Sequence, residues 1–490
     1  LAPGGDGRVR GPGDPLTSPL LRERSAALAA RLWNDRRNRS FTVAVVVAVV
    51  LRLAWAIFAT GPISSELSDP AQYLSYAERF SAGGTPHLYG EPTAFLPPGY
   101  PLFLAPLSFL ARHTGWISVN FAASLANVAL GTATVVFTAL LARRWIGPAA
   151  RNPAAWIMAL APGHIYYTSV VLSETLFAAL TTGLLLAATR LLSDEQQRRA
   201  RWFVLFGLGV GFALLVRTPG VILLVAPALV LRTATGSWRG ALRATGWAVL
   251  GALVLIVPWT IRNAVQIGVA VPISTNNAAF LCTGHHDGAT GQFDATPEGQ
   301  RYCFGGSAYD RGNADEARWY RRTSSRAISW ALHHPVDEVR LTLWKTYDTM
   351  ADDREALSDA EDFGNRRLFD ERVRGIFLTL ANAWHWGVLS FAAAGLVWVR
   401  ACRRAVPLWV TALVMLVAVW GGLALGRYHH PIMPLLVVFA AVLVTFGLVG
   451  RRFLKMLTQF MALQVEADRA NAMVKNSFTG MIFADTDDVI

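Results

Sequence analysis

The stretch FTVAVVVAVVLRLAWAIFAT, residues 41–60, decides the class of fold. It holds one charged residue, Arg52, and a helix of about 20 mainly apolar residues can cross the hydrocarbon core of a bilayer. The whole chain agrees, because 53% of its 490 residues are hydrophobic and only 16% are charged, against about 25% in soluble proteins. The mean hydropathy is +0.35. The sequence therefore predicts an all-α polytopic membrane protein.

Further apolar runs bring the expected number of transmembrane helices to about ten. Two of them are short and flank the turn-forming sequence Arg217-Thr-Pro-Gly220; a single long, kinked segment is the alternative there. The runs after the first are 117–141, 153–172, 174–192, 202–217, 218–232, 244–261, 376–399, 406–426 and 431–450.

The net charge of +12 follows the membrane topology. Arginines gather in every second loop, which places both termini in the cytoplasm by the positive-inside rule; merging the two short runs would invert everything after them. No basic patch with interleaved aromatic residues is present, which excludes a nucleic-acid-binding protein. Scarce lysine with abundant Ala, Val and Gly is typical of a GC-rich bacterial genome. We therefore expect a protein of a bacterial inner membrane, part of the cell envelope.

This topology divides the chain into five parts. We expect a disordered cytoplasmic leader at 1–40, a transmembrane core at 41–261 whose first external loop is 61–116, an external, mainly helical subdomain at 262–375, C-terminal transmembrane helices at 376–450, and a cytoplasmic tail at 451–490. Within the external subdomain, Ala317–Met350 has the periodicity of amphipathic helices that lie at a membrane surface. The tail is similar to the opening of a PAS-type domain but is too short to build a core.

The cysteines are consistent with this topology. Cys282 and Cys303 both fall in the external subdomain and Cys402 on the cytoplasmic side. Because the external side is oxidising, we predict a Cys282–Cys303 disulfide; two unpaired thiols are the alternative.

Charged and aromatic groups that interrupt the apolar pattern lie at the external ends of the spans. Such groups are costly beside lipid and indicate a site, here one for an anionic lipid-linked substrate. Arg52, inside the first span, could instead extend its charge to the membrane surface, and Glu78 with Arg79 is interpreted as exposed helix surface. The groups are Glu66, Asp69, His164, Tyr166, Tyr167, Glu174, Arg217, Arg262, Arg427, Tyr428, His429 and His430.

Several short motifs occur in order along the chain. They are LRL at 51–53 followed by Asp69, FLPPGYPLF at 95–103, Ser173-Glu174, RTP at 217–219, VPWTIRN at 257–263, NNAAFLCTGHHDGATG at 276–291 and RYHHPIMP at 427–434. In this order and at these topological places the sequence, from Arg52 to about Gly450, resembles the GT-C glycosyltransferases. It is similar in particular to bacterial relatives of the protein O-mannosyltransferases and to the aminoarabinose lipid A transferases, the glycosyltransferase 39 and 83 class.

The resemblance implies a GT-C type helical bundle and an inverting transferase. Such enzymes move a sugar from a polyprenyl-phosphate donor to an acceptor hydroxyl outside the cytoplasm. The first-loop acid is the base, which maps to Asp69, with Glu66 as the rival because the two acids stand three apart rather than as a pair. A helix N-cap is the structural alternative for Asp69, since Pro70 follows it.

The resemblance also assigns the remaining site residues. Arg262 and Arg427 would hold the donor phosphate, and Arg52 is a third candidate for that role. The candidate substrate-binding residues are Glu174, His164, Tyr100, Tyr428 and His429.

The expected partners are the lipid-linked sugar donor, membrane lipids and an acceptor that is a protein, a glycan or a lipid. No redox cofactor is needed, and a divalent metal is left open by the resemblance; adjacent His429 and His430 are poor joint metal ligands. A transporter or flippase of lipid-linked substrates is the alternative function. It would place ionisable residues near the bilayer midplane on broken helices of paired repeats, and no internal repeat is apparent.

Overall fold

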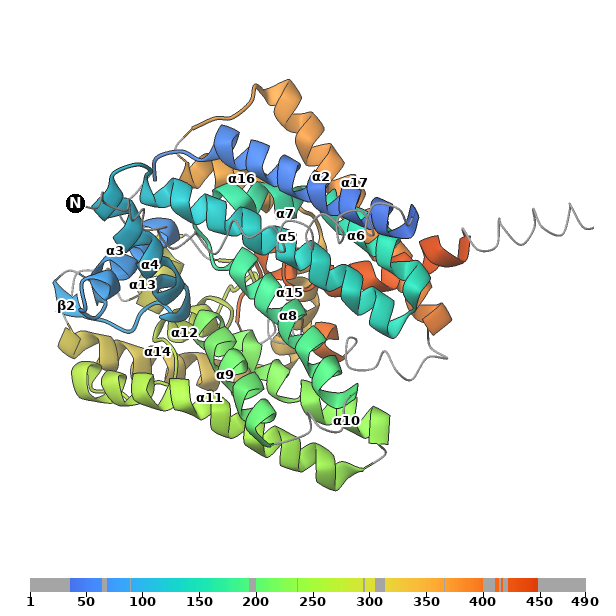
Figure 1. The fold of residues 1–490 in the computed structure, drawn as a ribbon. Coiled ribbons are helices and arrows are strands. Elements are labelled where there is room, and N and C mark those ends of the chain that lie inside the picture. The colour runs from blue at the N-terminus through green and yellow to red at the C-terminus, as the bar shows by residue number, and fades with distance from the viewer. Residues whose placement is uncertain are drawn as a thin grey trace, which may run out of the picture.

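The computed structural model describes residues 36–63, 68–88, 90–193, 200–235, 237–293, 296–304, 313–364, 366–399, 410–413, 416 and 422–447. These residues form a bundle of long helices that run side by side, with shorter helices gathered mainly toward one end (Figure 1). Within the described ranges, the only sheet is a two-stranded antiparallel one, in which β1 (His87–Leu88) pairs with β2 (Glu91–Pro92).

Among the residues that the structure describes, four helices are long and apolar enough to cross a membrane. They are α2 (Arg36–Ala59), α5 (Val119–Trp145), α11 (Trp238–Ile267) and α17 (Glu371–Val399). Shorter apolar helices accompany them, namely α9 (Ala200–Val216), the segment Thr218–Arg232 and the helix Met433–Gly447. The segment Thr218–Arg232 consists of η5 (Thr218–Leu224) and the start of α10 (Ala226–Thr235). The predicted class, a helical membrane protein, is confirmed.

The run 153–172, expected to be one transmembrane helix, is broken. It forms α6 (Arg151–Ala159), α7 (Pro162–Tyr166) and η3 (Tyr167–Ser169), and the chain is extended at Val170. Pro162 is the cause, because it lacks an N–H for the helix and holds the preceding residue, Ala161, at ψ 108°. The break brings Tyr167 and Ser173 close to the N-terminus of α8 (Glu174–Ser193).

The first loop, 61–116, holds two helices. These are α3 (Asp69–Ser81) and α4 (Gly99–Thr114), which lie against each other (Figure 1). Gly99 lets α4 approach the end of α9, since a Cβ at Gly99 would lie 2.5 Å from the backbone of Leu215 and Val216. This contact fixes the loop beside Arg217.

The segment expected to be an external subdomain is mainly helical among its described residues. It consists of α12 (Asn276–Thr283), α13 (Pro297–Phe304), α14 (Asn313–His333), α15 (Pro335–Met350) and α16 (Glu355–Phe363). Cys282 on α12 is bonded to Cys303 on α13, the pairing that the sequence predicts. Trp319 of α14 donates to the carbonyl of Cys303 at 2.9 Å, which joins a third helix to the disulfide.

Small residues set the contact between α9 and α11. A Cβ at Gly207 of α9 would lie 2.0 Å from the carbonyl oxygen of Ala248, and one at Gly251 of α11 would lie 2.1 Å from that of Val204. The two backbones can therefore touch only because these positions are glycine, as is common where helices meet in a membrane.

Three sequence expectations lie largely outside the described residues. They are the leader 1–40, the run 406–426 and the tail 451–490, of which the structure describes only 36–40, 410–413, 416 and 422–426. The last of these residues opens η8 (Gly426–His429).

Candidate functional site

Four charged side chains from four distant parts of the chain meet at one place, and we call them the charged cluster. Asp69 opens α3, Glu174 opens α8, Arg217 follows α9, and Arg427 lies in η8. Nη1 of Arg217 lies 2.5 Å from Oε1 of Glu174. Nη2 of Arg427 lies 3.0 Å from Oδ2 of Asp69, and its Nε lies 3.6 Å from Oε1 of Glu174. The two arginines are thus bridged by Glu174.

Exposure differs sharply within the charged cluster. The side chain of Glu174 is 2% exposed, whereas that of Asp69 is 37% exposed. Oε2 of Glu174 is buried without a hydrogen-bond partner in the described structure. Asp69 is therefore the acid of the cluster that an incoming molecule can reach, and Glu174 keeps an unused acceptor.

Local sequence explains how Asp69 is presented. Ser68 caps α3, because its hydroxyl accepts from the backbone N–H of Ala71 at 3.4 Å. The alternative in which Asp69 itself is the N-cap is wrong, since Asp69 is already the first helical residue. Its carboxylate is left to pair with Arg427.

Helix α16 places two more acids next to the charged cluster. Oε2 of Glu355 accepts from the backbone N–H of Arg427 at 2.6 Å, and Oδ2 of Asp359 accepts from the hydroxyl of Tyr167 at 3.1 Å. Burial raises the pKa of Asp359 to about 8; the positive charge of Arg427 opposes that rise and Glu355 adds to it. Burial also raises the pKa of Glu355. Asp359 is therefore protonated at neutral pH.

Tyr428 covers one side of the charged cluster. The guanidinium of Arg217 lies 5.0 Å from the centre of the Tyr428 ring. The ring centres of Tyr428 and Phe280, on α12, are 5.7 Å apart. An arginine over an aromatic face is held in a fixed orientation. Tyr428 thus links the helices of residues 276–363 to the cluster.

Two adjacent histidines lie at the end of η8: His429 is its last residue, and His430 follows it. His429 is buried, with Nδ1 2.9 Å from the carbonyl oxygen of Thr349 and Nε2 3.2 Å from Oδ1 of Asp353. The ring of His430 stacks on that of His164 with centres 3.5 Å apart. His429 contacts the protein through both nitrogens, so its placement favours support of η8 over substrate contact.

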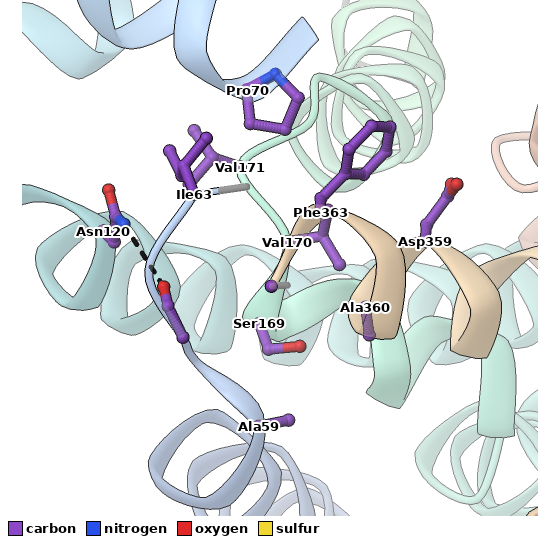
Figure 2. A pocket seen from close by; sticks show the side chains of 12 residues that line it. Ala59, Ile63, Pro70, Asn120, Ser169, Val170, Val171, Asp359, Ala360 and Phe363 are labelled. Atoms are coloured by element: carbon purple, nitrogen blue, oxygen red, sulfur yellow. Dashed lines mark hydrogen bonds between the residues drawn. The ribbon is translucent and has the colours of Figure 1, made fainter. Parts of the chain in front are cut away.

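A small, partly open pocket lies beside the start of α3. Figure 2 shows Pro70, which follows Asp69, and Asp359 on its border, with Val170 and Phe363 among the apolar lining. Asn120 donates to the carbonyl of Gly61 at 3.3 Å and steadies the adjoining chain. The pocket therefore has apolar walls and an acid edge.

Two arginines assigned to the donor phosphate lie elsewhere. Arg52 is 0% exposed and donates to the carbonyls of Ala48, Met158 and Ala159, so it holds the end of α6. Arg262 donates to the carbonyls of Thr93 and Pro86 and lies over the ring of Trp259.

The remaining predicted residues are placed as follows. Tyr100 is 0% exposed in the core, in edge contact with Tyr73, and its ring is closed to a sugar in this structure. His164 is buried under His430. Glu66 lies outside the described residues. Glu78 pairs with Arg112 on the exposed face of α3, as expected for surface residues.

Sequence reasoning missed Asp353, Glu355 and Asp359, and it gave Arg217 no role. The acid-rich run DDREALSDAED at 352–362 is a signal that could have found the three acids. Among the residues that the structure describes, no three His, Cys, Asp or Glu side chains are grouped so that they could hold a metal ion.

No protein-family model matches the sequence, and no curated protein matches it significantly. Solved structures do. The oligosaccharyltransferase of Archaeoglobus fulgidus in its apo form aligns with a TM-score of 0.50 and 13% identity over 87% of this chain and 52% of that one. The same enzyme, called AglB, in complex with an inhibitory peptide and a dolichol-phosphate, gives 0.50 and 13% over 86% and 51%. This chain therefore spans about half the length of these relatives.

A further structure aligns less well. ArnT from Cupriavidus metallidurans bound to undecaprenyl phosphate gives a TM-score of 0.39 and 15% identity over 84% of this chain and 77% of that one, which is too low to support a shared fold by itself. The alignment with the archaeal enzyme agrees with the helical membrane architecture and with the resemblance found in the sequence. The chain has the GT-C type fold of membrane-embedded glycosyltransferases.

Proposed function

We propose that this protein is an inverting glycosyltransferase that moves a sugar from a polyprenyl-phosphate donor to an acceptor hydroxyl at the outer face of a membrane. The charged cluster carries the proposal, because it sets a reachable carboxylate, Asp69, 3.0 Å from an arginine that can bind a phosphate. The shared fold supports the same class of chemistry, since the archaeal enzyme is an oligosaccharyltransferase.

The reaction assigns one task to each end of the charged cluster. Asp69 takes the proton of the acceptor hydroxyl, whose oxygen forms the new bond to the anomeric carbon. The bond from that carbon to the phosphate oxygen breaks, and the electron pair leaves with the polyprenyl phosphate. Arg427 and Arg217 stabilise that negative charge, and the buried Glu174 holds both guanidinium groups in place through its Oε1.

The pairing of Arg427 with Asp69 couples donor binding to base activation. A phosphate that binds Arg427 competes with the carboxylate of Asp69 for the same guanidinium. The released carboxylate is a stronger base than a paired one, because a neighbouring positive charge stabilises the ionised form. The donor therefore prepares the base that the acceptor needs.

The test uses the full chain in lipid nanodiscs with polyprenyl-phosphate sugars extracted from a deletion strain, in which the natural donor accumulates. Asp69→Asn should abolish sugar transfer while donor binding persists. Glu78→Gln, which changes an exposed acid of the same helix, is the matched control and should transfer normally. Unchanged transfer in Asp69→Asn would rule out Asp69 as the base, and movement of the donor across the bilayer without transfer would favour a flippase.

A further inference from the structure

An apolar face covers the last turns of α14 and one side of α15. Ile328 and Leu332, one turn apart on α14, are 50% and 76% exposed. On α15, Val336, Val339 and Leu343 are 81%, 64% and 68% exposed, and Trp344 and Tyr347 are 49% and 59% exposed. Spacings of three and four residues place the α15 side chains on one side of the helix.

The opposite side of α15 faces the protein. Leu341, Lys345 and Thr349 are all buried, at 5%, 0% and 0% exposed. On α15, large apolar side chains point outward and a lysine points inward. This is the reverse of the arrangement expected for a helix whose outer side faces water. Soluble surfaces rarely leave an apolar patch of this kind open.

Exposed arginines lie on the same two helices as this face. Four on α14 and one on α15 are exposed, and the exposed acid on α15 is Asp337. Arg340 lies between Val336 and Trp344 in angle around α15, where its long apolar stem can lie along the patch while the charge reaches outward. The α14 arginines are Arg318, Arg321, Arg322 and Arg326.

We propose that the consecutive helices α14 and α15 contact a membrane. Their partner is the headgroup and upper acyl region of a bilayer that contains anionic lipid. Exposed aliphatic and aromatic side chains beside arginines are the composition that binds there. The same chain contains helices that are long and apolar enough to cross a bilayer. A second copy related by two-fold symmetry would bring two sets of like arginine charges together, which opposes that occupant.

Contact of α15 with lipid would also steady η8. The carbonyl of Thr349, on the buried side of α15, accepts from Nδ1 of His429. The membrane contact itself does not depend on the proposed glycosyl transfer, so a physical measurement can test it alone.

The experiment is spin labelling of the full chain in nanodiscs, in a Cys402→Ser background that keeps the Cys282–Cys303 disulfide. Labels at Val339→Cys and Leu343→Cys are compared with a label at Ser75→Cys, an exposed polar position on α3. Collision with oxygen, which concentrates in lipid, is measured against collision with a water-soluble nickel chelate. We expect an oxygen-to-nickel ratio several-fold higher at the two α15 positions, and higher in nanodiscs with phosphatidylglycerol than with phosphatidylcholine alone.

Two results would overturn the proposal. Equal ratios at all three positions would mean that the α15 face lies in water. Low collision with both reagents at Val339→Cys and Leu343→Cys would mean that protein covers the face, either a second copy or another segment. Replacing the four α14 arginines by glutamine should remove the preference for anionic lipid, and persistence of that preference would overturn its assignment to these arginines.

Discussion

The pair formed by Asp353 and His429 gives the sharpest prediction about stability. Both nitrogens of His429 face oxygens that can only accept hydrogen bonds, the carbonyl of Thr349 and the carboxylate of Asp353. A ring that donates from both nitrogens, which is the cationic form, satisfies both acceptors. Burial by itself lowers the pKa of His429, but the hydrogen bond and negative charge of Asp353 outweigh burial and raise the pKa above its usual value.

The perturbation is Asp353→Asn. The other carboxylate oxygen of Asp353 accepts from the backbone N–H of Gly163 at 3.1 Å, and an amide oxygen can keep that bond. What is lost is the charged partner of a buried cation, since the two side chains are only 4% and 6% exposed. Breaking such a pair costs roughly 3–5 kcal/mol, and the retained bond to Gly163 favours the lower end, about 3 kcal/mol.

The sign of the pH dependence follows from the raised pKa. A histidine whose folded pKa exceeds its unfolded value of about 6.5 contributes stability that is complete below pH 6.5 and is lost as pH rises through the folded pKa. The wild-type protein should lose this contribution above pH 6.5. The Asp353→Asn variant should lack it, so the two proteins should differ most at low pH.

The assay is the free energy of unfolding by denaturant, followed by tryptophan fluorescence in detergent micelles from pH 5.5 to 8.5. Asp337→Asn changes an exposed acid of α15 and is the control, expected within about 0.5 kcal/mol of the wild type. A destabilisation of Asp353→Asn that is the same at both ends of the pH range would refute the charged state of His429.

Three further predictions concern packing, the disulfide and the site. Gly207→Ala should destabilise the protein by about 1–3 kcal/mol through overpacking against a carbonyl of α11, whereas Gly246→Ala, which meets nothing within 4 Å, should not; equal thermal shifts would contradict the contact. Cys282→Ser should cost about 3 kcal/mol in unfolding free energy measured without reductant, an effect that vanishes when both proteins are reduced. Above pH 8 the ionised Asp359 should compete with the donor phosphate for Arg427 and raise KM for the donor, and Asp359→Asn should flatten that rise in a transfer assay.

The sequence predicts much of the architecture because long apolar runs form helices for reasons that are local. The runs at 41–60, 117–141 and 376–399 correspond to α2, α5 and α17. The broken run at 153–172 was also readable from Pro162, whose effect on the chain is local. Hydropathy alone concealed the break, because apolar residues such as Ile157 and Val170 lie on both sides of it.

Convergence of Asp69, Glu174 and Arg427 was predictable for a different reason. Each lies at the end of an apolar run, and topology assigned all three ends to one side of the membrane. Glu355 and Asp359 could not be found this way, because α16 lies between runs and its place depends on how the 276–363 helices fold back. Only contacts such as that between Glu355 and the N–H of Arg427 fix it.

The arginines show where sequence reasoning stops. Arg52, Arg262 and Arg427 each lie in or next to an apolar run, so the sequence treats them as equivalent candidates for a phosphate. The partners separate them: Arg52 and Arg262 donate to backbone carbonyls, whereas Arg427 pairs with carboxylates. A carbonyl partner belongs to the fold and cannot move away without disrupting it. A carboxylate of a side chain can yield the guanidinium to a phosphate of similar charge, which makes Arg427 the arginine suited to bind and release a substrate.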